Sequence, residues 1–167
     1  MSSTNRGAVR NAHDFYATPQ EPIELLLNEL DLSKVSSFCE PCRGDNAILK
    51  HFAGVDRLDY AEIREGINYL EKDYEADLIV TNPPFSEALE FLEKSLNEAK
   101  TVVYLLRLNF LGSQKRKQFW NDNPPSHIFV LSKRPSFTGK GTDSTEYAWF
   151  CWDKSEVIKR DSGVYVL

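Results

Sequence analysis

The segment from Leu78 to Phe85 reads Leu-Ile-Val-Thr-Asn-Pro-Pro-Phe and is the most informative part of the chain. Its apolar beginning is typical of a buried strand, but two consecutive prolines cannot continue a central strand because neither has an N–H for the ladder. The strand end carries two hydrogen-bond acceptors, the side-chain oxygen of Asn82 and the rigidly held carbonyl of Pro83, followed by Pro84 and the flat ring of Phe85. This pattern favours a site for a planar group with an exocyclic NH2, such as adenine, over a structural Pro-Pro loop.

The composition is that of an ordinary globular chain. A length of 167 residues is typical of one domain with a substantial core, and 41% hydrophobic and 27% charged residues are common values for soluble proteins. No apolar run approaches the roughly 20 residues of a membrane span. Residues 1–13 lack the apolar core of a signal peptide. We therefore expect a cytoplasmic protein that does not contact a membrane.

The charge is unevenly distributed along the chain. The formal net charge is −5, yet the stretch from Arg107 to Lys140 holds seven Lys or Arg residues and one acid, Asp122. A local basic stripe on an acidic protein can steer phosphate to one face. The alternative is a solvated surface, which is the usual meaning of short charged runs such as Gln114 to Lys117.

The cysteines do not form a disulfide framework. Cys39-Glu40-Pro41-Cys42 is an isolated CxxC motif, and the other candidate metal ligands are the distant Cys151 and three scattered histidines. A zinc site needs about four ligands, and a redox pair is the next alternative for this motif. The same residues fit a cofactor-binding loop better than either, so we expect no metal site.

Apolar strand patterns alternate with helical patterns along most of the chain. Such alternation predicts a parallel or mixed sheet with helices on its faces. Strands are expected at residues 35–39, 57–63, 67–70 (short), 77–81, 101–106, 127–131 and 146–152, and helices from Pro19 and over residues 47–52, 86–99 and 113–120.

A second strand end carries an acid and a tight turn. The segment from Phe38 to Asn46 reads Phe-Cys-Glu-Pro-Cys-Arg-Gly-Asp-Asn, in which Glu40 ends the predicted strand and Gly44 permits close approach of the backbone to a ligand. In an open α/β sheet, ligands bind beyond the carboxyl ends of the strands. The two strand ends are therefore expected to meet at one site.

Together these segments resemble class I methyltransferases that use S-adenosylmethionine, and in particular small phage-type and bacterial DNA N6-adenine methyltransferases. Their catalytic motif is Asn/Asp-Pro-Pro-aromatic, and the resemblance covers about residues 14–152. It implies a three-layer, Rossmann-like α/β fold with a mostly parallel, seven-stranded sheet whose last strand is antiparallel. It also implies one domain over residues 1–167, with residues 1–13 flexible and no separate target-recognition domain.

The resemblance also implies a set of residues that bind S-adenosylmethionine. Glu40 meets the methionine ammonium, and Glu62, 22 residues further on, accepts hydrogen bonds from the ribose hydroxyls. An acid after the third strand takes the adenine NH2, for which Asp73 is preferred over Asp77. Arg43 is larger than the family's usual residue, and Asn46 stands where a second glycine is usual. The predicted cofactor-binding residues are Tyr16, Thr18, Pro19, Glu40, Pro41, Gly44, Asp45, Glu62, Ile63, Asp73, Tyr74 and Asn82.

Alternatives remain for the less specific motifs. Glu62 is alternatively a surface acid beside Arg64, and the segment before Pro19 is alternatively an aromatic turn that starts a helix. The loop from Lys133 to Ser144, which combines cations, hydroxyls and an aromatic ring, is alternatively a solvent-exposed hairpin loop.

The implied activity is methyl transfer to the exocyclic N6 of adenine in DNA. Asn82, Pro83, Pro84 and Phe85 would be catalytic, and no metal is needed because methyl transfer from a sulfonium is a direct displacement. The predicted DNA-binding residues are Lys115, Arg116, Lys133, Arg134, Phe137 and Lys140. Alternative substrates for the same motif are cytosine N4, RNA adenine and protein glutamine N5. The remaining alternative is an inactive nucleic-acid-binding or anti-restriction module on the same fold.

Overall fold

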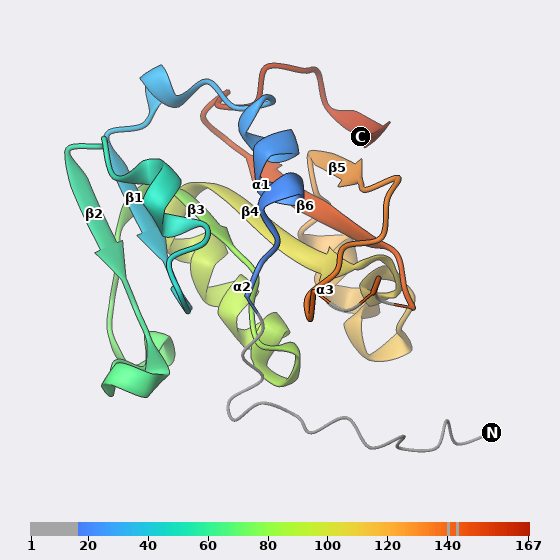
Figure 1. Cartoon of the computed structure of the whole chain (residues 1–167), viewed down its shortest axis with the longest axis horizontal. Helices are drawn as coiled ribbons and strands as arrows, with labels where there is room; N and C mark the ends of the chain where they lie inside the picture. The colour runs from blue at the N-terminus through green and yellow to red at the C-terminus, as the bar shows by residue number, and fades with distance from the viewer. Residues whose placement is uncertain (1–16, 140, 143) are drawn as a thin grey trace.

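The computed structural model describes residues 17–139, 141–142 and 144–167, and within them seven strands form one sheet (Figure 1). The predictions for residues 1–13, Tyr16 and Lys140 fall outside the described residues. The order of the strands across the sheet is β2-β1-β3-β4-β6-β5-β7. The strands are β1 (Ser37–Glu40), β2 (Arg57–Tyr60), β3 (Ala76–Thr81), β4 (Ala99–Arg107), β5 (His127–Val130), β6 (Tyr147–Asp153) and β7 (Gly163–Val166).

The strand directions confirm the predicted fold class. Strands β1 to β4 pair in parallel, with β2 beside β1, β1 beside β3, and β3 beside β4. Strand β6 is antiparallel to both of its neighbours, β4 and β5, and corresponds to the antiparallel strand expected over residues 146–152. The sheet is therefore mixed but mostly parallel.

Two strands differ from the sequence-based expectation. The short strand expected over residues 67–70 is wrong, because this segment contains the 3-10 helix η5 (Tyr69–Glu71), in which the side chain of Asn68 accepts a hydrogen bond from the Leu70 N–H. An Asn that caps a turn in this way competes with extended structure. Strand β7 was not expected, and it pairs in parallel with β5. Four residues carry too little periodicity to reveal a strand.

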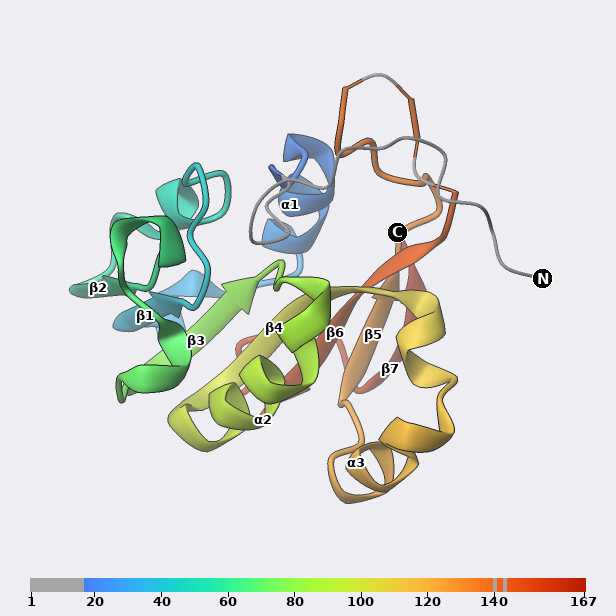
Figure 2. The ribbon, with the colours of Figure 1, turned by 90° about the horizontal axis from the view of Figure 1, so that it is seen from below.

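The helices cover both faces of the sheet. Helix α1 (Gln20–Leu27) lies on one face, and α2 (Ala88–Glu98) and α3 (Lys117–Asp122) lie on the other (Figure 2). The helix expected over residues 47–52 is a 3-10 helix, η3 (Leu49–Phe52), and the helix expected over residues 86–99 begins at Ala88, with Glu87 as its N-cap residue. The other 3-10 helices are η2 (Leu32–Lys34), η4 (Ile63–Glu65), η6 (Phe85–Glu87), η7 (Leu108–Leu111) and η8 (Gln114–Arg116). No helix in the described part of the chain is both long and apolar enough to cross a membrane.

Alternate residues of the central strands build the two halves of the core. On β3, Leu78 and Val80 pack on the α1 side, whereas Ile79 packs on the side of α2 and α3. This follows from the two-residue period of a strand, which sends successive side chains to opposite faces. Because both faces are covered, the middle of β3 is the continuous apolar run Leu78 to Val80, as the sequence predicted.

The parallel strands β1, β3 and β4 end at the same edge of the sheet. Glu40 is the last residue of β1, Asn82 follows β3, and Arg107 is the last residue of β4. The sheet therefore brings an acid, an amide and a guanidinium together from segments more than 20 residues apart in sequence. This is the edge at which ligands bind in open α/β sheets.

Candidate functional site

A cavity of about 860 Å3 opens at this edge of the sheet. Its volume lies within the usual range for small-molecule and cofactor sites, about 300–1,000 Å3. The structure brings most of the predicted site residues to this one cavity. Its lining includes Thr18, Glu40, Pro41, Gly44, Asp45, Glu62, Ile63, Asn82, Pro83, Pro84, Phe85 and Phe137.

Two predicted adenine contacts do not reach the cavity. Asp73 is exposed, whereas Tyr74 is buried, with its N–H donating to Glu98 and its hydroxyl to the Tyr60 carbonyl. Neither residue belongs to the cavity lining, which contains Asn68 in this region instead. The segment after β2 forms the 3-10 helices η4 and η5 rather than the expected strand, so Asn68 and not Asp73 borders the site.

Several other predicted residues lie away from this cavity. Pro19, Lys133 and Arg134 border a second, smaller cavity of about 260 Å3. Lys115 and Arg116 line neither cavity. The guanidinium of Arg116 instead donates to the Phe110 carbonyl (2.8 Å) and stacks on the Phe110 ring.

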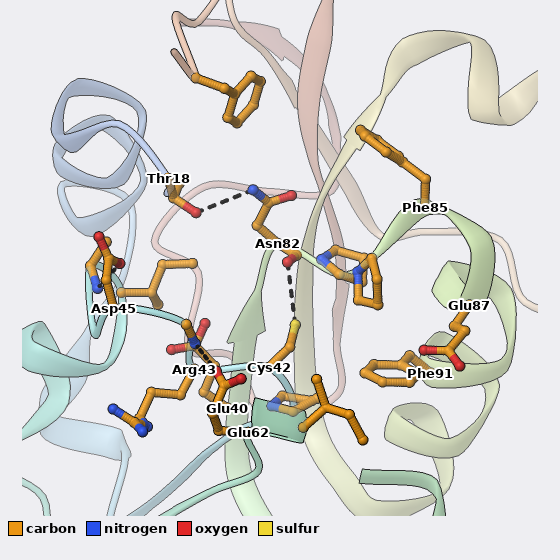
Figure 3. Close-up of a pocket in the computed structure, with 18 of the residues that line it drawn as sticks. Thr18, Glu40, Cys42, Arg43, Asp45, Glu62, Asn82, Phe85, Glu87 and Phe91 are labelled. Atoms are coloured by element: carbon orange, nitrogen blue, oxygen red, sulfur yellow. Dashed lines mark hydrogen bonds between the residues drawn. The ribbon is translucent and has the colours of Figure 1, made fainter. Parts of the chain in front are cut away.

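The side chain of Asn82 has a defined orientation in the cavity. Its Nδ2 donates to Thr18 Oγ1 at 3.2 Å, and the amide oxygen lies on the side of Phe85 (Figure 3). Phe85 follows in η6 and is 41% exposed, an unusual fraction for a large aromatic ring. An acceptor oxygen and an accessible ring thus border the same space.

A chain of hydrogen bonds lies beneath Asn82 and joins β1 to β3. Thr81 Oγ1 donates to Glu40 Oε2 (3.2 Å), and Cys42 Sγ lies 3.0 Å from Thr81 Oγ1. The Cys42 thiol also donates to the backbone carbonyl of Asn82 (3.2 Å; Figure 3). Burial raises the pKa of Cys42, which keeps it a neutral thiol. Cys42 therefore anchors the backbone of the motif that follows β3, a role that sequence reasoning missed.

Glu40 is an unusual buried acid. It is 2% exposed, and its Oε1 has no hydrogen-bond partner among the described residues. Burial raises the pKa of this carboxyl well above its ordinary value of 4.5, only partly offset by the hydrogen bond from Thr81. A cationic group that reached Oε1 from the cavity would satisfy the unpartnered atom and favour the carboxylate. The residue thus fits an ammonium ligand.

The turn after β1 has the geometry of a glycine-rich loop. Gly44 and Asn46 both have positive φ, 58° and 72°, and the Gly44 N–H donates to Glu62 Oε2 at 2.8 Å. Asn is among the residues that tolerate the left-handed region. Arg43 also borders the cavity, and its guanidinium forms an ion pair with Glu65 and lies 4.6 Å from the centroid of the Tyr60 ring.

Replacement of Asn46 by alanine should destabilise this turn. An L-residue without a short polar side chain is strained at φ 72°, and the change also removes the hydrogen bond from Arg43 Nη1 to Asn46 Oδ1 (3.1 Å). We expect Asn46→Ala to lower the free energy of unfolding by about 1–2 kcal/mol, measured by urea denaturation. Asn46→Gly is the matched control, because it loses the same hydrogen bond but adopts the positive φ without strain. It should therefore be less destabilising than Asn46→Ala, and equal destabilisation by both would refute the strain argument.

Glu62 is already a carboxylate with several donors. It is 5% exposed and accepts hydrogen bonds from the N–H of Gly44 and from both the N–H and Nε of Arg64, the last two at 3.0 Å. Burial alone would raise its pKa, but the donors of Arg64 and Gly44 hold the pKa below its ordinary value. A ribose diol would add to, or replace, these donors.

The cations of the loop after β5 pair with acids. Lys133 Nζ lies 3.1 Å from Glu21 Oε2, and Arg134 Nη2 lies 2.6 Å from Glu146 Oε1. The hydrogen bond and charge of Arg134 lower the pKa of Glu146. Any phosphate that binds these two cations has to compete with a carboxylate, a contact that the sequence did not reveal.

An aromatic and basic group lies around Phe85. The guanidinium carbon of Arg107 is 4.3 Å from the centroid of the Phe85 ring, and Arg107 Nε donates to the Tyr147 hydroxyl at 3.1 Å. The ring of Phe137 in turn lies 5.0 Å from the ring of Tyr147. Arg107 and Tyr147 also line the cavity. Sequence reasoning counted Arg107 only as part of a basic stripe, because its neighbours come from three separate segments.

Comparison with solved structures agrees on the architecture. A proposed class I S-adenosylmethionine-dependent methyltransferase of Listeria monocytogenes superposes with a TM-score of 0.62 at 13% identity, over 96% of this chain and 67% of that one. A proposed RNA methyltransferase of Pyrococcus horikoshii gives a TM-score of 0.56 at 14% identity, over 83% of this chain and 86% of that one. The modification subunit of a proposed type I restriction enzyme from Vibrio vulnificus gives a TM-score of 0.57 at 12% identity, over 90% of this chain and 49% of that one.

The chain has the class I methyltransferase fold. No protein-family model matches the sequence, and a search of curated proteins finds no match either. At identities of 12–14% the likeness establishes the fold alone. In this class I fold, Glu40 and Asn82 occupy adjacent strand ends and face one cavity.

Proposed function

We propose that the protein is an S-adenosylmethionine-dependent methyltransferase that acts on the exocyclic N6 of adenine in DNA. The observation that carries the proposal is the orientation of Asn82. Its amide nitrogen is engaged by Thr18, and its oxygen lies on the side of the exposed Phe85 ring, at a cavity large enough for a cofactor (Figure 3). An NH2 acceptor beside a stacking face suits an aminated base.

The cavity also fits the cofactor. S-adenosylmethionine carries a methyl group activated on a sulfonium. Glu40 would hold its ammonium through the unpartnered Oε1, Gly44 would allow close approach of the backbone, and Glu62 would accept the ribose hydroxyls. We assign the adenine end to the region of Ile63 and Asn68, which line the cavity where Asp73 does not.

The residues of the Asn82 motif have separable roles in the proposed reaction. The lone pair of adenine N6 is delocalised into the ring, so this nitrogen is a poor nucleophile. Hydrogen bonds from its NH2 to the Asn82 oxygen and the Pro83 carbonyl would localise the lone pair and stabilise the positive charge that develops on nitrogen. This is preorganised electrostatic stabilisation, with the sign reversed relative to an oxyanion hole. Phe85 would hold the base by stacking, which contributes about 1–3 kcal/mol per base.

Several features support a nucleic acid as the substrate, of which we propose DNA. Adenine N6 is buried in a duplex, so the base has to be extruded or presented in a single strand. Arg107 and the rings of Phe85 and Phe137 line the cavity and provide charge and stacking surfaces of the kind that nucleic-acid sites use. Cytosine N4, RNA adenine and protein glutamine N5 are alternative acceptors for the same motif.

Transfer of label from the cofactor identifies the acceptor. The protein is incubated with S-adenosylmethionine labelled in its methyl group and, separately, with DNA, RNA and a protein mixture. We expect label in DNA, released as N6-methyladenine on digestion to nucleosides. Label that enters protein but not DNA or RNA would overturn the proposal, and label as N4-methylcytosine would change the base but keep the chemistry.

A second candidate function is a nucleic-acid-binding module that has lost the reaction. It is favoured by Arg43, a large residue that lines the cavity, and by the donors that already occupy Glu62. Calorimetry with S-adenosylhomocysteine separates the two candidates. Binding supports the enzyme, whereas no binding at about millimolar concentration, equivalent to less than about 4 kcal/mol, supports the inactive module.

A further inference from the structure

Arg107 covers one face of the Phe85 ring, on which the proposed substrate would stack. Its guanidinium carbon lies 4.3 Å from the centroid of Phe85, and its Nε donates to the Tyr147 hydroxyl at 3.1 Å. Arg107 comes from the end of β4, Phe85 from η6 and Tyr147 from the start of β6, and all three side chains border the cavity. The contact therefore lies at the place where a base would enter.

The spacing leaves no room for a base between the two groups. Flat groups in contact are separated by about 3.5 Å, so a base between the guanidinium and the ring would need about 7 Å. The observed 4.3 Å closes this face of Phe85. A base that stacks on the covered face must first displace Arg107 from the ring.

We propose that Arg107 is a gate that selects a nucleobase carrying phosphate, as in a polynucleotide, over a free base or nucleoside. The proposal rests on the proposed function, because it takes Phe85 as the stacking face for the target base. Displacement costs the cation–π contact with Phe85 and strains the hydrogen bond to Tyr147. A nucleoside offers the displaced guanidinium no anion, whereas a neighbouring phosphate accepts its N–H groups in the bidentate geometry that arginine favours.

Binding of two ligands to two variants tests the gate. The probes are 2′-deoxyadenosine and a single-stranded oligonucleotide of deoxyadenosine, each titrated in the presence of S-adenosylhomocysteine. Arg107→Ala should bind the nucleoside about two- to fivefold more tightly, since the covering cation is gone. It should bind the oligonucleotide about tenfold more weakly, with the salt slope reduced by about 0.7 for one lost phosphate contact.

Arg107→Lys is the matched variant, because it keeps the charge but has no planar group to stack. It should retain the salt slope of the wild type for the oligonucleotide and still bind the nucleoside more tightly. In a Phe85→Ala background, removal of Arg107 should no longer improve nucleoside binding. Thermal unfolding of each variant confirms that it is folded.

Arg107→Ala should raise the affinity for the nucleoside and lower the affinity for the oligonucleotide. These opposite changes distinguish a gate from a structural role. Parallel weakening of both ligands by Arg107→Ala, no change in either, or a wild type that binds neither ligand would overturn the gate. These titrations need no turnover. Failure of the proposed function would show separately. Arg107→Ala would still have opposite effects on the two affinities, but the wild type would transfer no methyl group to DNA or RNA.

Discussion

Asn82→Ala should lower kcat for methyl transfer by about 10²–10³-fold while leaving the affinity for S-adenosylhomocysteine nearly unchanged. The substitution removes one of two preorganised acceptors for the amino group, and loss of one such group in a comparable site has an effect of this size. Cofactor contacts are assigned mainly to Glu40, Gly44 and Glu62, which the change does not touch. Single-turnover kinetics on DNA and calorimetry with the cofactor product measure the two quantities.

Two variants serve as controls for Asn82→Ala. Asn82→Asp keeps an acceptor oxygen but loses the donation to Thr18, so its defect should be smaller than that of the alanine variant. Asn97→Ala makes the same change at an exposed position of α2 and should retain wild-type turnover. Wild-type turnover in Asn82→Ala would show that the motif after β3 is not catalytic, whatever the fold.

Glu40→Gln should weaken S-adenosylmethionine binding by about 30-fold or more. The removal of one member of a buried charge pair costs about 2 kcal/mol or more, and Glu40 Oε1 has no other partner among the described residues. Glu93→Gln, an exposed position of α2, is the matched control and should bind as the wild type does. Equal affinities of the Glu40→Gln variant and the wild type would remove Glu40 from the cofactor site.

Glu40→Gln should also make the stability of the cofactor-free protein less dependent on pH. Burial raises the pKa of Glu40 above its ordinary value of 4.5, so the folded chain holds a proton that the unfolded chain has lost. The contribution of the protonated Glu40 to the free energy of unfolding is fully present below pH 4.5, the ordinary pKa of the group. It is lost as the pH rises through the raised pKa of the folded protein. The cofactor-free wild type should therefore lose more Tm than Glu40→Gln between about pH 5 and pH 8.

Cofactor binding by the wild type should correspondingly release protons. An ammonium at Glu40 favours the carboxylate, so affinity should rise with pH in the range where the free carboxyl is protonated. Calorimetry in buffers of different ionisation enthalpy measures the number released, which should fall in Glu40→Gln. Identical proton release by both proteins would assign the effect to another group.

Local sequence patterns predicted the parts of the site that lie at strand ends. The apolar run before Asn82 and the acid before Pro41 mark the ends of β3 and β1, and parallel strands bring their carboxyl ends to one edge. Gly44 and Asn46 were readable because few residues accept a positive φ. Each of these features depends on the type of a single residue or on a short apolar pattern. It can therefore be recognised without knowing which distant segments pack against it.

The sequence by itself determined the layered α/β architecture and the meeting of Glu40, Glu62 and Asn82 at one cavity. Only the tertiary structure decided the contacts around them. Arg107 covers Phe85 because β4 lies between β3 and β6, and strand order is set by the packing of whole faces rather than by any residue in β4. The position of Asn68 rather than Asp73 at the cavity, the thiol of Cys42 beneath Asn82 and the presence of β7 have the same origin. Each depends on contacts between distant segments, whose free energy is not encoded in the local pattern of either segment.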